Sequence, residues 1–460
     1  MKRRKTEELM KTHRTIRPER VMALGFLPVI ALGTLLLALP AASQSGQSIG
    51  GFNALFTATS AVCVTGLVTV DTGTTFSALG QGVLLLLIQT GGLGFMILAT
   101  MVLMALGRKF TLRDRMLIKE ATSADSLSGL LRVTRSYTFL TLLVELIGAV
   151  LLATRFVPRF GWGKGIWFSV FHAVSAFCNA GFDLFGDFSS LTRWCNDPVV
   201  ILTISVLIIL GGLGFSVVFE ALRDIRHAQR LSLHAKVALV MSGALLMLGT
   251  AFYALVEWNN PGTLASTAIS GAGSKVMNAF FQSVTMRTAG FNSVPLDRLR
   301  EGSKLFSVVL MFIGASPAST GGGLKTTTFG AVLLITLSVV RGQKDVNVMG
   351  RRLPTDLLRR ALAIMTIFMA FLFVGILAIV LSEREGKGTV DLIFEATSAL
   401  ATVGVSAAGT PKLTLASKAV LLPMMYLGRI GPMTLALALA KREGSANQHI
   451  RYPEENLMIG

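Results

Sequence analysis

Eight long apolar stretches separated by short polar links constrain this chain more than any other feature. Each stretch is long enough to cross the roughly 30 Å hydrocarbon core of a membrane as a helix. Of the 460 residues, 52% are hydrophobic and only 15% are charged, which is typical of a polytopic membrane protein. The sequence therefore predicts an all-α membrane protein with eight spans, at 21–41, 77–106, 134–156, 198–222, 235–257, 304–340, 359–382 and 416–440.

The net charge of +18 does not indicate a nucleic-acid-binding surface, because the basic residues gather in alternate links. Of the 43 lysines and arginines, 28 lie at 2–20, 106–135, 223–236, 341–360 and 441–460. Basic links stay on the cytoplasmic side, so we expect an inner-membrane protein with both termini in the cytoplasm. The basic and apolar parts of the N-terminus are too long for a cleaved signal peptide, and a retained helix is expected.

A shorter, semi-apolar segment lies between the two spans of each pair, and the four segments share one pattern. A phenylalanine stands ten residues before a glycine in all four, the glycines being Gly66, Gly181, Gly290 and Gly404. Serine stands six residues before the glycine in three repeats, and Val284 takes that place in the third. A period of this kind indicates a repeat architecture. We expect four parallel repeats of helix, pore helix and helix around a pseudo-fourfold pore.

The predicted units follow from these repeats. No unit is long enough to form a separate soluble domain, so a regulatory domain would have to come from another chain. The units are a basic cytoplasmic N-terminus at 1–20, repeat 1 at 21–106, a cytoplasmic link at 107–133, repeat 2 at 134–222, repeat 3 with a broken second helix at 235–340, repeat 4 at 359–440 and a cytoplasmic tail at 441–460.

The matched glycines favour a cation filter made of backbone carbonyls. The segments before them are too short to cross a membrane and predict half-membrane helices, whose carbonyl ends carry partial negative charge. Non-helical backbone at that depth must line a cavity, and glycine lets successive carbonyls face an ion. Close helix packing is the alternative for any single glycine. Asp71 and Asp183 follow two of the glycines and either attract cations or are ordinary loop acids.

These segments resemble the four filters of the Trk/Ktr/HKT superfamily of potassium transporters, and the likeness extends over about residues 20–440. Eight spans without an additional N-terminal pair look most like its Ktr branch. The resemblance implies that K+ binds backbone carbonyls at the four glycines. It implies a filter formed by Val64, Thr65, Gly66, Asn179, Ala180, Gly181, Thr288, Ala289, Gly290, Thr402, Val403 and Gly404.

The same resemblance implies the ion and the partners. Gly66 stands where sodium-favouring relatives often carry serine, which implies potassium as the preferred ion, with sodium as a candidate coupling ion. No covalently bound cofactor is expected. A homodimer surrounded by membrane lipid, on a cytoplasmic ring of RCK-type nucleotide-binding subunits, is the implied assembly.

Proline and consecutive glycines break helices, so the span at 304–340 should unwind in mid-membrane. A static kink is the alternative. The resemblance implies a gate at Gly314, Pro317, Gly321, Gly322, Gly323 and Lys325. The stretch is not a phosphate-binding loop, because Leu324 separates the glycines from Lys325.

Arg429 lies in the middle of the last span, where an arginine is costly and therefore a functional candidate. The resemblance implies that it projects into the pore beside the gate. A structural pair with a carboxylate such as Glu145 or Glu220 is the alternative.

The expected function is the pore-forming subunit of a potassium uptake system. No paired acids, HExxH motif or nucleophile–base pair suggests an enzyme. The first alternative is the K+-binding membrane subunit of an ATP-driven potassium pump. The second, an alternating-access carrier, would be supported by inverted repeats, and none is seen.

Overall fold

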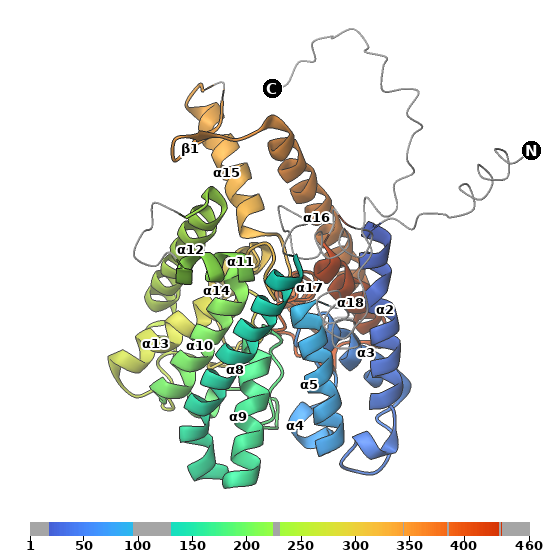
Figure 1. The fold of residues 1–460 in the computed structure, drawn as a ribbon. Coiled ribbons are helices and arrows are strands. Elements are labelled where there is room, and N and C mark those ends of the chain that lie inside the picture. Colours follow the sequence, from blue (N-terminus) through green and yellow to red (C-terminus); the bar gives the residue numbers. More distant parts are fainter. Residues whose placement is uncertain are drawn as a thin grey trace, which may run out of the picture.

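The computed structural model describes residues 18–94, 130–223, 231–343, 345–383, 386–431 and Thr434. The regular structure of this part is helical apart from a hairpin of two short strands, β1 (Asn347–Val348) and β2 (Arg351–Arg352), as Figure 1 shows. The prediction of an all-α protein is confirmed. The predicted units at 1–20, 107–133 and 441–460 lie wholly or mainly outside the described residues.

Long and short helices alternate along the described part of the chain. The first half of the chain contains α2 (Pro18–Leu37), η1 (Pro40–Ala42), α3 (Gly51–Val62), α4 (Thr72–Thr75), α5 (Ala78–Leu93), α8 (Leu130–Phe160), α9 (Trp162–Phe177), η2 (Thr192–Trp194), α10 (Pro198–Leu213) and α11 (Phe215–Arg223). The second half contains α12 (Leu233–Glu257), α13 (Gly271–Thr285), α14 (Glu301–Phe312), α15 (Thr326–Val340), α16 (Thr355–Ser382), α17 (Thr389–Leu400), η4 (Thr410–Lys412) and α18 (Leu415–Ile430).

Three helices of the described part are long and apolar enough to cross a membrane, at Thr134–Phe160, Leu233–Glu257 and Thr355–Ser382. A fourth span results if α10 and α11 are counted together, although the chain bends by 103° between them. The apolar stretch at 198–222 is therefore two helices, because Gly214 adopts a φ of 91° that ends α10. The stretch at 304–340 is also interrupted, between Phe312 and Thr326.

Glycines allow the second helix of a repeat to lie close against the short helix that precedes it. In three repeats a glycine two residues before the end of the second helix sits against the carbonyl of the last residue of the preceding short helix, α3, α9 or α17. A Cβ atom there would meet that carbonyl oxygen. The pairs are Gly91 with Val62, Gly211 with Phe177 and Gly428 with Leu400. Tight packing and a bend, both expected of glycine-rich helices, occur together here.

Candidate ion-binding site

The four predicted filter loops meet in a closed ring within one chain. A Cβ atom on Gly66 would lie 2.5 Å from the carbonyl oxygen of Ala180 in the next repeat. The corresponding distances are 2.9 Å from Gly181 to Ala289 and 2.9 Å from Gly290 to Val403. Gly404 closes the ring against the carbonyl oxygen of Thr65. Each glycine therefore contacts the carbonyl before the glycine of the following repeat, and no side chain fits between them.

Backbone conformation repeats from loop to loop. The glycines have φ of 94°, 69°, 86° and 89°, in chain order. Two residues earlier, φ is also positive, at 55°, 57°, 72° and 52° for Val64, Asn179, Thr288 and Thr402. Left-handed backbone is tolerated by asparagine but is an outlier for β-branched residues, and such strain concentrates at functional sites. Because φ changes sign at every residue, successive carbonyls can face the same side, as an ion-binding backbone requires.

Hydroxyl groups on the short helices α3, α9, α13 and α17 hold these loops. Ser60 and Ser398 accept hydrogen bonds from the backbone N–H groups of Gly66 and Gly404, both at 3.0 Å. Ser175 donates to the carbonyl of Phe182 at 2.8 Å. These are the serines six residues before the glycine, a pattern that the sequence presents without indicating its purpose.

Repeat 3 departs from the predicted register by one residue. Thr285, and not Val284, supplies the hydroxyl, donating to the carbonyl of Phe291 at 2.5 Å. Likewise Phe281 is fully buried, whereas Phe280 is only partly buried. In every repeat the buried phenylalanine stands four residues before the residue that supplies the hydroxyl. Repeat 3 therefore has one residue fewer between this hydroxyl and the glycine. The sequence does not show the difference, because Phe280 stands beside Phe281 and fits the same spacing as the phenylalanines of the other repeats.

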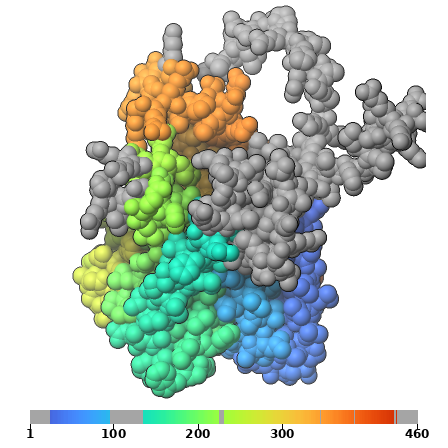
Figure 2. All heavy atoms as spheres, viewed as in Figure 1, coloured from blue at the N-terminus to red at the C-terminus, as the bar shows by residue number. Residues whose placement is uncertain are grey.

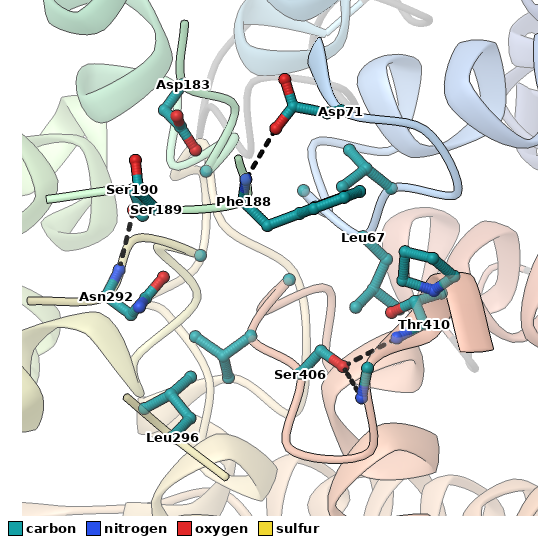
Figure 3. A pocket seen from close by; sticks show the side chains of 18 of the residues that line it. Leu67, Asp71, Asp183, Phe188, Ser189, Ser190, Asn292, Leu296, Ser406 and Thr410 are labelled. Carbon is teal, nitrogen blue, oxygen red and sulfur yellow. Dashed lines mark hydrogen bonds between the residues drawn. The ribbon is translucent and has the colours of Figure 1, made fainter. Parts of the chain in front are cut away.

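A cavity of about 490 Å³ opens at the end of the ring formed by the glycines, and all four glycines line it. Figure 3 looks into this cavity. Asp71 accepts hydrogen bonds from the backbone N–H groups of Thr74 and Phe188, at 2.9 and 2.7 Å, and so joins repeat 1 to repeat 2. Burial raises the pKa of the Asp183 carboxyl to about 7, and the nearby Asp71 charge adds to the rise.

The predicted gate residues lie at the opposite end of the ring. Gly321 and Gly322 pack so closely under Thr288 and Thr402 that a Cβ on either would meet a threonine hydroxyl. Gly323 has a φ of 71° and packs against Gly314. The glycines thus let the loop approach the start of the filter loops.

Repeat 2 supports this loop. Thr320 donates its hydroxyl to the carbonyl of Phe177, at 3.1 Å, and its N–H to the carbonyl of Gly211, at 3.2 Å. The Pro317 carbonyl oxygen lies 2.5 Å from where a Cβ on Gly214 would be. The bend after α10 therefore makes room for the loop.

Two cations accompany this loop, and both are held by carbonyls. Lys325 donates to the carbonyl of Gly321 at 2.7 Å. Arg429 donates to the carbonyls of Thr320, in the loop, and of Gly91, at the end of α5. It thereby links repeats 4, 3 and 1. The alternative carboxylates are engaged elsewhere: Glu220 accepts from Ser232, and Glu145 from Gln89 at 3.2 Å.

Glu145, which does not pair with Arg429, lies behind the second filter loop. Its carboxyl group is buried beside the thiol of Cys178, at 3.8 Å, and Gln89 bridges both groups. Cys178 directly precedes Asn179, so this cluster ties the end of α9 to α5 and α8. Only its position inside an apolar span signals it in the sequence.

Comparison with known proteins defines the class. The sequence matches the family described as TrkH, cation transport protein, over residues 13–449. It is 40% identical over 445 residues to the Ktr system potassium uptake protein B of Bacillus subtilis, covering 96% of this chain and 97% of that one. It is 37% identical over 452 residues to the potassium/sodium uptake protein NtpJ of Enterococcus hirae, covering 98% and 99%. The fold is similar to the crystal structure of TrkH from Vibrio parahaemolyticus, with a TM-score of 0.71, 17% identity and coverage of 93% and 86%.

The apolar helices and these relatives define a membrane transport protein, not an enzyme. The chain belongs to the TrkH family of cation transport proteins. The resemblance inferred from the four glycine segments is thereby confirmed.

Proposed function

We propose that this chain is the pore-forming subunit of a potassium uptake system and that K+ crosses the membrane through the ring of four loops. The observation that carries the proposal is the ring itself, in which four glycines and four left-handed residues stand in register. Relatives over nearly the full chain are named for potassium uptake. This favours the uptake subunit over the pump subunit.

The carbonyls of the four loops replace the hydration shell of the ion. A backbone site fits K+ because no carboxylate lies in the filter segments, so the ion is held by dipoles and can leave again. The cavity at the glycine end collects ions, and Asp71 and Asp183 both line it. Sodium is a candidate coupling ion, since one relative is named for potassium and sodium uptake.

The loop from Gly314 to Lys325 is the gate. Two considerations support this role. Its glycines fill the space next to Thr288 and Thr402, and the positive charges of Lys325 and Arg429 oppose the passage of a cation. Opening requires that the hydrogen bonds from Arg429 to Thr320 and Gly91 be released.

The same proposal includes the topology and the assembly. Eight spans in four parallel repeats place both termini and the basic links in the cytoplasm of an inner-membrane protein. Pore subunits form a homodimer on a cytoplasmic ring of RCK-type nucleotide-binding subunits. This part is supported by the relatives named as components of Ktr systems.

Rubidium uptake into vesicles containing this chain alone tests the proposal. Uptake should proceed without ATP and should be inhibited by potassium but hardly by sodium. Equal competition by sodium would contradict a potassium filter, and a requirement for ATP would favour the pump subunit. If no uptake occurs even with the Ktr partner of a relative added, the chain is not a pore-forming subunit.

A further inference from the structure

A second cavity, of about 520 Å³, lies between α12, α15 and α16, next to the hairpin of β1 and β2. Figure 1 shows α15 above α12, with α16 to its right, and in Figure 2 the orange part of the chain adjoins the lime-green helix α12. Leucines and other aliphatic residues form most of the lining, among them Leu334, Leu357 and Ile364. The size is that of small-molecule pockets, about 300–1,000 Å³.

The cavity contains a cationic side chain that makes no ion pair with the described residues. Arg360 lines it, is exposed, and makes no ion pair within the described part of the chain. Asp356, one turn earlier on α16, also lines the cavity but does not pair with Arg360. The hydroxyl-bearing residues Thr327 and Thr328 lie on the opposite wall, on α15. An apolar cavity with an unpaired guanidinium and hydroxyl groups suits a ligand with an apolar tail and an anionic head.

The length of α16 places Arg360 at a membrane surface. From Ser382 back to Arg360 the helix is about 33 Å long at 1.5 Å per residue. The hydrocarbon core is about 30 Å thick. With Ser382 at one edge of the core, Arg360 therefore lies at the level of the lipid headgroups, and Ile364 lies within the hydrocarbon.

We infer that this cavity binds one anionic glycerophospholipid, whose phosphate contacts Arg360 while an acyl chain fills the aliphatic part between α12, α15 and α16. The placement of this end of α16 on the cytoplasmic side rests on the proposed function. The cytoplasmic leaflet is rich in anionic lipids, which arginines near its surface attract. Arg351, Arg352 and Arg359 are also exposed in this segment, but of the four arginines only Arg360 lines the cavity, and Arg352 pairs with Asp345 at 2.9 Å.

The lipid would contact α15, the helix that directly follows the proposed gate loop. α15 begins at Thr326, directly after Lys325, and Thr327 and Thr328 both line the cavity. Since a ligand stabilises the state that it binds, occupancy favours the arrangement of α15 described here.

Native mass spectrometry of the full-length protein tests this inference, with dioleoyl phosphatidylglycerol as the probe and dioleoyl phosphatidylcholine as the neutral comparison. We expect one phosphatidylglycerol per chain. Arg360→Ala should lower its retention about fivefold, the value of one basic residue at an anionic surface. Asp356→Asn should raise it, because a like charge is removed beside the phosphate. The matched control Arg351→Ala, an exposed arginine outside the cavity, should change little.

Three results would overturn the inference. Equal losses in the Arg360 and Arg351 variants would mean that general surface charge attracts the lipid. Equal retention of the neutral lipid would mean that no headgroup is recognised. Disulfide cross-linking between copies at Thr328→Cys would mean that a second chain occupies the cavity. Lipid binding is measured without ion flux, so its outcome is independent of whether the chain carries potassium.

Discussion

Backbone conformation at single residues decides what the filter loops can be. Thr288 and Thr402 hold left-handed backbone that a β-branched residue adopts at a cost of about 1–3 kcal/mol. Hydroxyl groups from the pore helices and close contacts between loops maintain it. The sequence identifies the glycines but not the strained residues two positions before them, because valine and threonine are not residue types that favour a positive φ.

Gly66→Ala tests the ring at this scale. The new Cβ would lie 2.5 Å from the Ala180 carbonyl, in a backbone conformation that alanine avoids, so the carbonyls can no longer face one ion together. We expect rubidium uptake to fall by at least about fivefold, as about 1–3 kcal/mol of added strain implies. Gly82→Ala is the control, because a Cβ on Gly82, in α5 of the same repeat, meets nothing within 4 Å. Equal uptake by the two variants would show that Gly66 does not form the ion path.

Among the side chains, a charge inside an apolar span is the clearest signal in the sequence. Arg429 is a functional candidate for that reason, and in the structure it donates to the carbonyl of Thr320, in the loop proposed as the gate. Asp71 was expected to be either a cation attractor or a solvated acid. It is a link between repeats, with the backbone N–H of Phe188 as its partner. Long-range partners of this kind cannot be read from local sequence, since Asp71 and Phe188 are brought together only by the ring.

At the scale of helices, hydropathy predicts where apolar segments lie but not where they bend. The segments before the four filter glycines are short helices, α3, α9, α13 and α17, as their limited apolar length predicts. The second helices stop early because Gly94, Gly214 and Gly431 adopt positive φ. Glycine is common within membrane helices, so the sequence alone does not distinguish a glycine that packs from one that ends a helix.

The gate prediction belongs to this scale, because Arg429 connects three elements. Arg429→Ala removes two charge-assisted hydrogen bonds, to Thr320 and Gly91, which stabilise the loop where it lies. We expect rubidium uptake by the chain without a cytoplasmic partner to rise about tenfold, the effect of one such bond. Arg429→Lys should give a smaller rise in uptake, because lysine keeps the positive charge but does not have the planar guanidinium group, whose two NH2 groups donate to two carbonyls at once.

Arg341→Ala is the matched control, since this exposed arginine ends α15 without contacting the loop. Uptake by Arg429→Ala that equals or falls below that of the unaltered chain, with an unchanged melting temperature, would contradict the holding role.

For the whole molecule, the order of contacts between the repeats decides how many chains form the ring. Repeat 1 contacts repeat 2, repeat 2 contacts repeat 3, repeat 3 contacts repeat 4, and Gly404 returns to Thr65. The ring therefore closes within one chain, and a partner copy adds no residue to it. The fourfold pattern in the sequence predicted a shared axis, whereas the number of chains around that axis was fixed only by the contact between the last repeat and the first.

This closure predicts how mixtures of active and inactive chains behave. If each chain contains a complete pore, vesicles made with unaltered and Gly66→Ala chains in varying ratio should take up rubidium in proportion to the unaltered fraction. If four chains shared one pore, uptake would fall as about the fourth power of that fraction, so that an equal mixture would keep roughly one-sixteenth of the activity. Labelled chains of both kinds must first be shown to co-assemble, so that linearity reflects independent pores within a mixed assembly. A linear response also allows a homodimer, since two chains can associate while each conducts through its own ring. A curved response would mean that the inactive chain impairs its neighbour, and that the ring is not self-sufficient.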